Sequence, residues 1–182
     1  MQDNLILCGF MGCGKSEIAK ALAERTGLTL VDMDTYIEQK LDLSIPEIFA
    51  RFGEAHFRLL ECEAAAELGQ KSGQIISSGG GAVVYEPTRQ ALKACGKVIF
   101  LHVPLEVLQQ RLKNDTGRPL LQVDDRAERI RSLYQERLPI YRQAADFIVH
   151  AVGTPQQICD EICGLMQLSE TSADGEKQRQ PK

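Results

Sequence analysis

A glycine-rich segment near the N-terminus has the residue types and spacing of a loop that binds nucleotide phosphates. It runs from Gly9 to Ser16 as G-F-M-G-C-G-K-S and fits the pattern G-x-x-x-x-G-K-[ST]. Glycines let backbone N–H groups turn inward toward phosphate oxygens. In such loops the lysine, here Lys15, reaches the β- and γ-phosphates, and the serine hydroxyl binds Mg²⁺. The segment therefore predicts a nucleoside triphosphate site, but it does not identify the group that receives the phosphate.

Two aspartates, Asp32 and Asp34, follow the apolar run Leu28–Val31. If the chain stays extended there, both carboxylates point the same way, toward the end of the sheet where phosphates bind. One could serve Mg²⁺, directly or through water, and the other could align or deprotonate an attacking hydroxyl. The alternative is a pair of ordinary strand-end or N-cap aspartates, with Asp34 capping a helix that begins at T-Y-I-E.

A run of small residues from Ser77 to Gly81, S-S-G-G-G, follows the third apolar run of the chain. Consecutive glycines leave backbone N–H groups uncovered and allow a small ligand to approach closely. The alternative is a flexible turn. Because this run should end beside the phosphate loop in a parallel sheet, we expect Gly79, Gly80 and Gly81 to face a ligand.

Four arginines stand at special places in an acidic protein. Arg58 precedes Glu61 by three residues, a helical spacing that can hold the guanidinium in one rotamer. Arg137 lies in E-R-L-P-I-Y, Arg118 in G-R-P-L-L, and Arg111 at the end of a helical pattern. Guanidinium groups bind carboxylates and phosphates through two parallel hydrogen bonds, which suits an anionic substrate. The alternative for each is a solvated surface arginine, and it stays open for Arg111.

Strands and helices that would position these residues alternate along the chain. Short, β-branched, non-alternating apolar runs are typical of parallel strands covered on both faces. These runs are Leu5–Cys8, Leu28–Val31, Gln74–Ile76, Val98–Val103 and Phe147–Val149. Helical patterns occupy Lys15–Thr26, Thr35–Leu41, Ile45–Gly53, His56–Lys71, Thr88–Ala94, Leu105–Asn114, Asp124–Ala145 and Pro155–Leu168. The alternation predicts a three-layer α/β/α sandwich with a central five-stranded parallel sheet and ligands at the C-terminal ends of its strands.

One domain is expected over residues 1–168, because the chain is long enough for one ordinary core and short for two. The stretch 112–124 contains Gly117 and Pro119 and separates two long helical patterns. A loop of this length in a compact domain is usually functional, so we expect a mobile lid there. Residues 169–182 have no large apolar side chain and are expected to form a disordered tail.

The composition limits the classes of protein to consider. The 182 residues are 43% hydrophobic and 25% charged, and the net charge of −4 argues against a nucleic-acid or membrane-surface partner. We expect no signal peptide, since no basic region precedes the first apolar run, and no stretch is long enough to span a membrane. Six cysteines without a C-x-x-C pair, together with three histidines, disfavour zinc. Cys159 and Cys163, one helical turn apart, could form a metal or redox pair, but a buried helix face in a reducing cytosol is favoured.

Taken together, these motifs resemble those of shikimate kinases. The resemblance runs from about Leu5 to Leu168, with several separate motifs in the family's order. They are G-F-M-G-C-G-K-S, D-M-D, G-E-A-H-F-R-L-L-E, S-S-G-G-G-A-V, G-R-P-L-L and E-R-L-P-I-Y-R-Q-A-A-D. The phosphate loop is shared with many kinases, whereas the combination of the others is far more specific. The resemblance implies a P-loop fold like that of nucleoside monophosphate kinases, a cytoplasmic monomer, and ATP-dependent phosphorylation of the 3-hydroxyl of shikimate.

The resemblance also implies roles for residues on the substrate side. Asp34 would contact shikimate hydroxyls and help to activate the one that is phosphorylated. Arg58 and Arg137 would hold the shikimate carboxylate, and Glu61 would hold Arg58. The remaining residues of the substrate pocket would be Gly79, Gly80, Gly81, Phe49 and Phe57.

On the nucleotide side, the implied roles centre on the phosphate loop. Lys15 and Arg118 would be catalytic, with Arg118 meeting the transferring phosphoryl group as the lid closes. Ser16 and Asp32 would hold Mg²⁺, with Ser77 in its outer shell. The residues implied to bind ATP are Gly12, Cys13, Gly14, Lys15, Ser16, Glu17, Arg111, Arg118 and Pro155, the last beside Thr154 near the adenine.

The chain departs from the family's pattern at two places, and rival interpretations stay open. Glu17 stands where the family usually has threonine, so it lacks the hydroxyl and adds negative charge near phosphates. The stretch A-V-G-T-P-Q-Q lacks an arginine found in some members.

One rival interpretation is a gluconate kinase on the same fold, whose substrate is also a hydroxylated acid. The others are a nucleotide-dependent switch, although the guanine-reading N-K-x-D motif is missing, and a degenerate homologue without activity.

Overall fold

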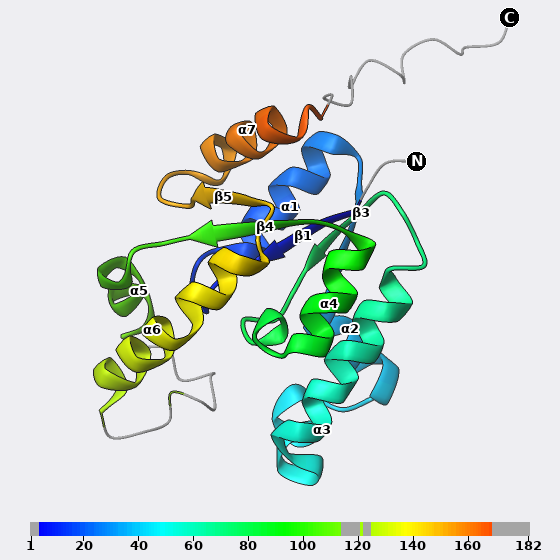
Figure 1. The fold of residues 1–182 in the computed structure, drawn as a ribbon, viewed down its shortest axis with the longest axis vertical. Helices are drawn as coiled ribbons and strands as arrows, with labels where there is room; N and C mark the ends of the chain where they lie inside the picture. The colour runs from blue at the N-terminus through cyan, green and yellow to red at the C-terminus, as the bar shows by residue number, and fades with distance from the viewer. Residues whose placement is uncertain (1–3, 114–120, 122–124, 169–182) are drawn as a thin grey trace, which may run out of the picture.

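A parallel sheet forms the centre of the computed structural model, which describes residues 4–113, 121 and 125–168 (Figure 1). Within those ranges the sheet has five strands in the order β2-β3-β1-β4-β5, and all neighbours are parallel. The strands are β1 (Asn4–Cys8), β2 (Thr29–Asp32), β3 (Gln74–Ser77), β4 (Gly96–His102) and β5 (Phe147–His150). This topology confirms the predicted fold and puts the end of β3, with its glycine run, next to β1 and the phosphate loop.

The strands at the centre of the sheet have side chains buried on both faces. All residues of β1 and β3 are buried, and Ile6 at the centre of β1 lies between Ile76 of β3 and Val98 of β4. A strand enclosed in this way requires a continuous apolar sequence, which is why the runs could be recognised. The observed strand ends differ from the predicted ones by at most two residues.

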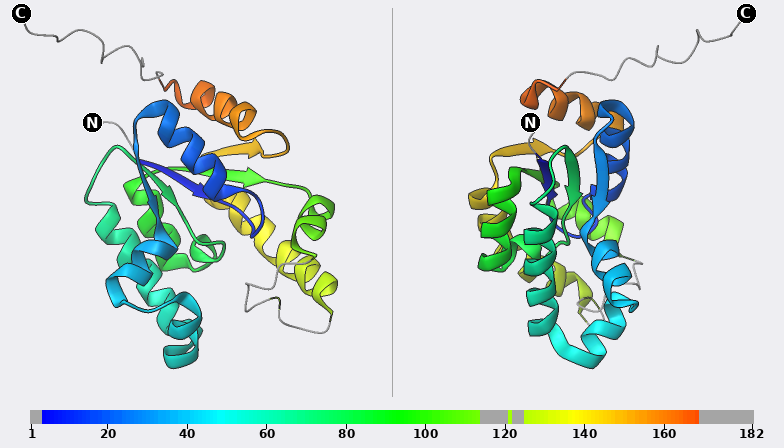
Figure 2. Two further views of the ribbon diagram at one scale, coloured as in Figure 1. Left: turned by 180° about the vertical axis from the view of Figure 1, so that it is seen from behind. Right: turned by 90° about the vertical axis from the view of Figure 1, so that its right-hand side faces the viewer.

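Helices cover both faces of the sheet, which gives the three predicted layers (Figure 2). Helix α1 packs against α7 on one face, whereas α4 lies on the other, where α4 and α6 both pack on β4. Helix α3 packs against α2 and α4 and extends away from the sheet (Figure 1). The helices are α1 (Lys15–Thr26), α2 (Met33–Leu41), α3 (Ile45–Leu68), α4 (Glu86–Cys95), α5 (Leu105–Leu112), α6 (Arg126–Ala144) and α7 (Pro155–Met166), with a short 3-10 helix at Ala82–Val84.

The segment that follows β2 differs from the sequence prediction. The strand ends at Asp32 and α2 begins at Met33, so the extended geometry predicted for D-M-D is wrong. Asp32 is the N-cap, because its carboxylate accepts a hydrogen bond of 3.1 Å from the Thr35 N–H. An aspartate that satisfies a free N–H group of the first turn stabilises the helix start, which explains why α2 begins earlier than predicted. Asp34 therefore belongs to the first turn of α2.

A kink at Gly53 lies where the sequence predicts one helix to end and another to follow. The predicted helices Ile45–Gly53 and His56–Lys71 correspond to the two halves of α3, which ends at Leu68. Gly53 interrupts the helix for one residue with φ 79° and ψ 172°, a conformation that glycine adopts without strain. The two halves of α3 bring Phe49 and Phe57 together, with ring centroids 4.8 Å apart.

Two predicted segments fall outside the described part of the chain. Residues 114–120 and 122–124 make up most of the predicted lid and include Arg118, and residues 169–182 are the predicted tail. Leu121, which is described, is fully buried. The lid and the tail therefore stay predictions.

Two further predictions concern the burial of cysteines on α7 and the presence of a membrane-spanning helix. Cys159 and Cys163 are both buried on α7, as the sequence predicts, and burial raises the pKa of the Cys159 thiol to about 11. A thiol with such a pKa stays protonated at neutral pH and behaves as a small apolar side chain. In the described ranges, no helix combines the length and hydrophobicity that crossing a membrane requires.

Candidate active site

The loop between β1 and α1 has the backbone shape that its glycines predict. Gly12 and Gly14 have φ values of 77° and 91°, which residues with a Cβ rarely adopt. Gly14 is the N-cap of α1, so the free N–H groups at the start of this helix border the loop. The Lys15 ammonium donates hydrogen bonds of 2.9 Å and 3.3 Å to the carbonyl oxygens of Gly9 and Phe10. The loop combines backbone donors with a cation, an arrangement suited to an anion.

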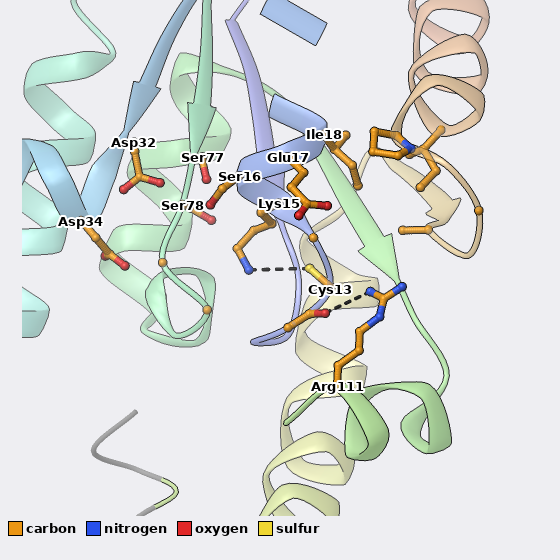
Figure 3. A pocket seen from close by; sticks show the side chains of 18 residues that line it. Cys13, Lys15, Ser16, Glu17, Ile18, Asp32, Asp34, Ser77, Ser78 and Arg111 are labelled. Carbon is orange, nitrogen blue, oxygen red and sulfur yellow. Dashed lines mark hydrogen bonds between the residues drawn. The ribbon is translucent and has the colours of Figure 1, made fainter. Parts of the chain in front are cut away.

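A cavity of about 540 Å³ opens beside this loop (Figure 3). Every described residue that the sequence assigns to ATP lines it, together with both aspartates: Gly12, Cys13, Gly14, Lys15, Ser16, Glu17, Asp32, Asp34, Arg111 and Pro155. The Arg111 guanidinium donates a hydrogen bond of 3.1 Å to the Gly12 carbonyl oxygen, which fixes the end of α5 to the phosphate loop. The cavity is large enough for a nucleotide-sized ligand.

Ser16 and Asp32, the residues predicted to hold Mg²⁺, both line this cavity, as does Ser77. One oxygen of the Asp32 carboxylate caps α2, which leaves the second oxygen for a ligand. Hydroxyl and carboxylate oxygens are hard donors that suit Mg²⁺, an ion that keeps several waters and needs few protein ligands. The donor set therefore fits this ion.

A second cavity, of about 380 Å³, is lined by all the residues predicted for the substrate: Asp34, Phe49, Phe57, Arg58, Glu61, Gly79, Gly80, Gly81 and Arg137. Helix α3 supplies the aromatic rings and Arg58, whereas α6 supplies Arg137. Two guanidinium groups beside an apolar wall can bind a small carboxylic acid, since the cations pair with the carboxylate and the rings cover the carbon skeleton.

The Arg58 guanidinium is held by two carboxylates of its own helix. It donates to Glu61 Oε2 over 2.6 Å and to Glu54 Oε1 over 2.7 Å. Only 1% of the Glu61 side chain is exposed, and burial raises its pKa to about 7 although Arg58 acts in the opposite direction. A cation fixed in this way is preorganised for a ligand.

Arg137 is also buried and has an unused donor. Its Nη1 donates to the Gly80 carbonyl oxygen over 3.4 Å, and the Tyr141 hydroxyl donates to the same oxygen. Its buried Nε has no hydrogen-bond partner among the described residues. A buried charged donor without an acceptor is unfavourable, so an anionic ligand here would be stabilised.

Asp34 and Glu61 direct two unsatisfied oxygens toward the glycine run. Within the described part of the chain, Asp34 Oδ1 and Glu61 Oε1 are buried without hydrogen-bond partners. A Cβ atom added to Gly79 would lie 2.8 Å from Asp34 Oδ1 and 3.0 Å from Glu61 Oε1. Burial, reinforced by the negative charge of Asp32, raises the pKa of Asp34. Both oxygens need donors, and the hydroxyl groups of a ligand could provide them.

The two cavities meet at three residues, since Asp34, Gly79 and Gly80 line both. A ligand seated on the phosphate loop and a ligand seated between the arginines would therefore approach each other beside the Asp34 carboxylate. This arrangement suits the transfer of a phosphoryl group to a hydroxyl, which depends on positioning two ligands and on a group that accepts or aligns the proton.

Comparison with known proteins identifies the family to which this chain belongs. The family model described as shikimate kinase matches residues 11–167. The chain belongs to the shikimate kinase family. A shikimate kinase of Thermodesulfovibrio yellowstonii is 40% identical over 160 residues, which are 87% of this chain and 92% of the relative. One from Halorhodospira halophila is 44% identical over 151 residues, 83% of this chain and 85% of the relative.

Solved structures of the shikimate kinase family share the fold. The shikimate kinase of Acinetobacter baumannii in complex with shikimate superposes with a TM-score of 0.87 at 35% identity, covering 92% of this chain and 94% of that one. A gluconokinase of Sinorhizobium meliloti, matched over 91% of both chains, reaches 0.54 at 14% identity. The second likeness shows a shared fold and nothing further.

Several residues that line the cavities were missed by sequence reasoning. In the substrate cavity they are Met11, Glu38, Ile45 and Pro46, and in the nucleotide cavity Ile18, Ser78, Ala151, Gly153 and Ile158. Glu38 had a usable signal, because it lies four residues after Asp34 and therefore on the same side of α2. Its Oε1 accepts a hydrogen bond of 2.8 Å from the Ile45 N–H, which joins α2 to the start of α3.

Burial of Glu61 should make the stability of the protein depend on pH. Its pKa is about 7 in the folded protein and ordinarily 4.5, so between these values the folded state holds a proton that the unfolded state has lost. The stabilisation from this group is complete below 4.5 and is lost as the pH rises through 7. Glu61→Gln removes the titration. In urea denaturation, the free energy of unfolding of the variant relative to wild type should therefore rise between about pH 5 and about pH 8. A difference that is independent of pH would contradict the assignment.

Proposed function

We propose that this chain transfers the γ-phosphoryl group of ATP to the 3-hydroxyl of shikimate, giving shikimate 3-phosphate and ADP on the pathway to chorismate and aromatic amino acids. The observation that carries the proposal is the junction of the two cavities at Asp34, Gly79 and Gly80. One cavity suits a polyphosphate, and the other suits a hydroxylated carboxylic acid. Family membership supports the same substrates, since the related Acinetobacter kinase was solved in complex with shikimate.

The proposed mechanism relies on positioning and charge stabilisation. The hydroxyl oxygen attacks the γ-phosphorus while the bond to the ADP oxygen breaks, and the hydroxyl proton passes to the Asp34 carboxylate. Lys15 neutralises charge on the β- and γ-phosphates, and Arg118 neutralises charge on the transferring group. Closure of the predicted lid at 112–124 would exclude water, which otherwise hydrolyses ATP.

Ser16 and Asp32 would hold Mg²⁺, with Ser77 in contact with its water shell. The bound ion supplies positive charge at the β- and γ-phosphate oxygens. Two hard oxygen donors in the nucleotide cavity support this assignment.

On the substrate side, Arg58 and Arg137 would clamp the carboxylate, with Phe49 and Phe57 against the ring. The unpartnered Nε of Arg137 and the carboxylates that hold Arg58 support this assignment. We further propose a cytoplasmic monomer that acts without a nucleic-acid or membrane partner, consistent with the net charge of −4.

An ADP-release assay with shikimate and gluconate offered separately tests the proposal against its rivals. We expect turnover that depends on ATP and shikimate, and none with gluconate. Turnover with gluconate alone would indicate a sugar-acid kinase. Binding of ADP without turnover on either acid would indicate a nucleotide-binding module or an inactive homologue.

Loss of either substrate arginine should act mainly on KM. Arg58→Ala and Arg137→Ala each remove a charge-assisted pair with the carboxylate, so KM for shikimate should rise about tenfold to a hundredfold with a smaller change in kcat. Arg51→Ala is the matched control for Arg58, because Arg51 is exposed on α3 and lines neither cavity. Steady-state kinetics with normal KM in both substrate variants would rule out the carboxylate clamp.

A further inference from the structure

Glu17 is the residue of the nucleotide cavity whose chemistry does not match its surroundings. It follows Lys15 and Ser16 in the first turn of α1 and lines the cavity with them (Figure 3). Its side chain is exposed, and within the described residues it makes no hydrogen bond or ion pair. A carboxylate without a partner therefore stands where phosphates are expected.

Among the described residues, two cations line the cavity, and neither pairs with this carboxylate. The Lys15 ammonium is hydrogen-bonded to the Gly9 and Phe10 carbonyl oxygens, and the Arg111 guanidinium to that of Gly12. Both cations are thus held by the loop backbone. A bound nucleotide would experience the Glu17 charge in addition to theirs.

The start of α1 attracts both the carboxylate and the phosphates. The free N–H groups of a helix N-terminus carry partial positive charge, so an acidic residue in the first turn stabilises the helix. The same N–H groups are the ones that bind phosphate in loops of this kind. In the free protein Glu17 is therefore favourable, whereas a bound phosphate would place like charges at one helix end.

We propose that Glu17 weakens nucleotide binding by electrostatic repulsion. This inference rests on the proposed function, since it requires phosphates on the loop. The same repulsion raises the ATP concentration that the enzyme needs.

Glu17→Gln tests the inference, because it removes the charge and nearly preserves the size of the side chain. Glu24→Gln is the matched control: Glu24 is exposed on the same helix and lines neither cavity. At low ionic strength, the Kd for ADP measured by calorimetry without shikimate should fall about fivefold in Glu17→Gln. It should stay unchanged in Glu24→Gln.

Salt and thermal stability provide two further readouts. The gain in affinity should shrink to less than about twofold at an ionic strength of about 0.5 M, because salt screens exposed charges. The Tm of the free Glu17→Gln protein should fall slightly, because the favourable interaction with the helix end is lost. A tighter complex and a less stable free protein form a combination that general structural damage would not produce.

The possible failures are distinguishable. If wild-type protein does not bind ADP, the proposed function itself is wrong. If wild type and Glu17→Gln bind ADP equally, or if the gain is independent of salt or shared by Glu24→Gln, the inference about Glu17 is wrong while the proposed function stands. Weaker ADP binding in Glu17→Gln would assign the side chain an attractive role and would equally overturn the inference.

Discussion

Asp34→Asn should lower kcat by about 10²–10⁴, since a positioned proton acceptor contributes a factor of this size. The carboxylate stands where the two cavities join, and its buried Oδ1 has no partner in the described part of the chain. Burial, then the charge of Asp32, raises its pKa, while Lys15 and Arg58 act in the opposite direction. A carboxylate with a raised pKa accepts a proton more readily. Asparagine keeps the shape of the side chain but cannot accept that proton.

The changes in kcat and in the Kd for ADP, taken together, identify the role of Asp34 more clearly than the size of the decrease in kcat alone. We expect kcat to fall while the Kd for ADP changes by less than about twofold, because the amide leaves the phosphate loop intact. Asp42→Asn is the matched control: Asp42 ends the same helix, α2, lines neither cavity and has a φ of 53° that asparagine tolerates. A nearly normal kcat in Asp34→Asn would remove this residue from the chemistry.

The backbone features that position the candidate site were predicted correctly from local sequence. Gly12 and Gly14 adopt positive φ values that few other residues allow, so a glycine-rich loop between strand and helix has few alternatives. The alternation of apolar runs and helical patterns predicted the parallel sheet, which the structure confirms. Since β3 pairs with β1, the glycine run ends beside the phosphate loop, as expected.

The start of α2 shows where local reasoning failed. Continuing the strand through D-M-D and capping a helix at Asp32 are both compatible with the sequence, and the hydrogen bond to the Thr35 N–H favours the second. Both aspartates nevertheless line the nucleotide cavity, because strand and helix meet at the C-terminal edge of the sheet. Because the helix was predicted to begin at Thr35, the prediction missed that Asp34 and Glu38 lie about one turn apart on the same helix.

Long-range packing could not be predicted from the residues alone. The division into two cavities that share Asp34 depends on where α3 and α6 lie relative to the glycine run, since residues of both helices line the second cavity. Arg58 and Arg137 come from these two helices, and no local sequence pattern indicates that they line one cavity. The unsatisfied Nε of Arg137 likewise becomes visible once its burial is known.

Lys15→Ala should lower kcat by about 10³ or more, because it removes the cation that we propose to neutralise charge on the β- and γ-phosphates. The ammonium donates hydrogen bonds to the Gly9 and Phe10 carbonyl oxygens, which keeps it beside the phosphate loop. The Kd for ATP should rise as well. Lys20→Ala is the matched control, since Lys20 is exposed on α1 and lines neither cavity.

Lys15→Arg separates the charge from the geometry. Arginine keeps the positive charge, but its planar guanidinium is larger than the ammonium that fits among the loop carbonyl groups, so most of the activity should still be lost. Thermal melting and circular dichroism check that both variants are folded. If Lys15→Ala kept more than about a tenth of the wild-type kcat, the charge at this position would contribute less than about 1.4 kcal/mol to the transition state. The proposed role of Lys15 would then be wrong, and the stabilisation of the γ-phosphate would have to come from another group.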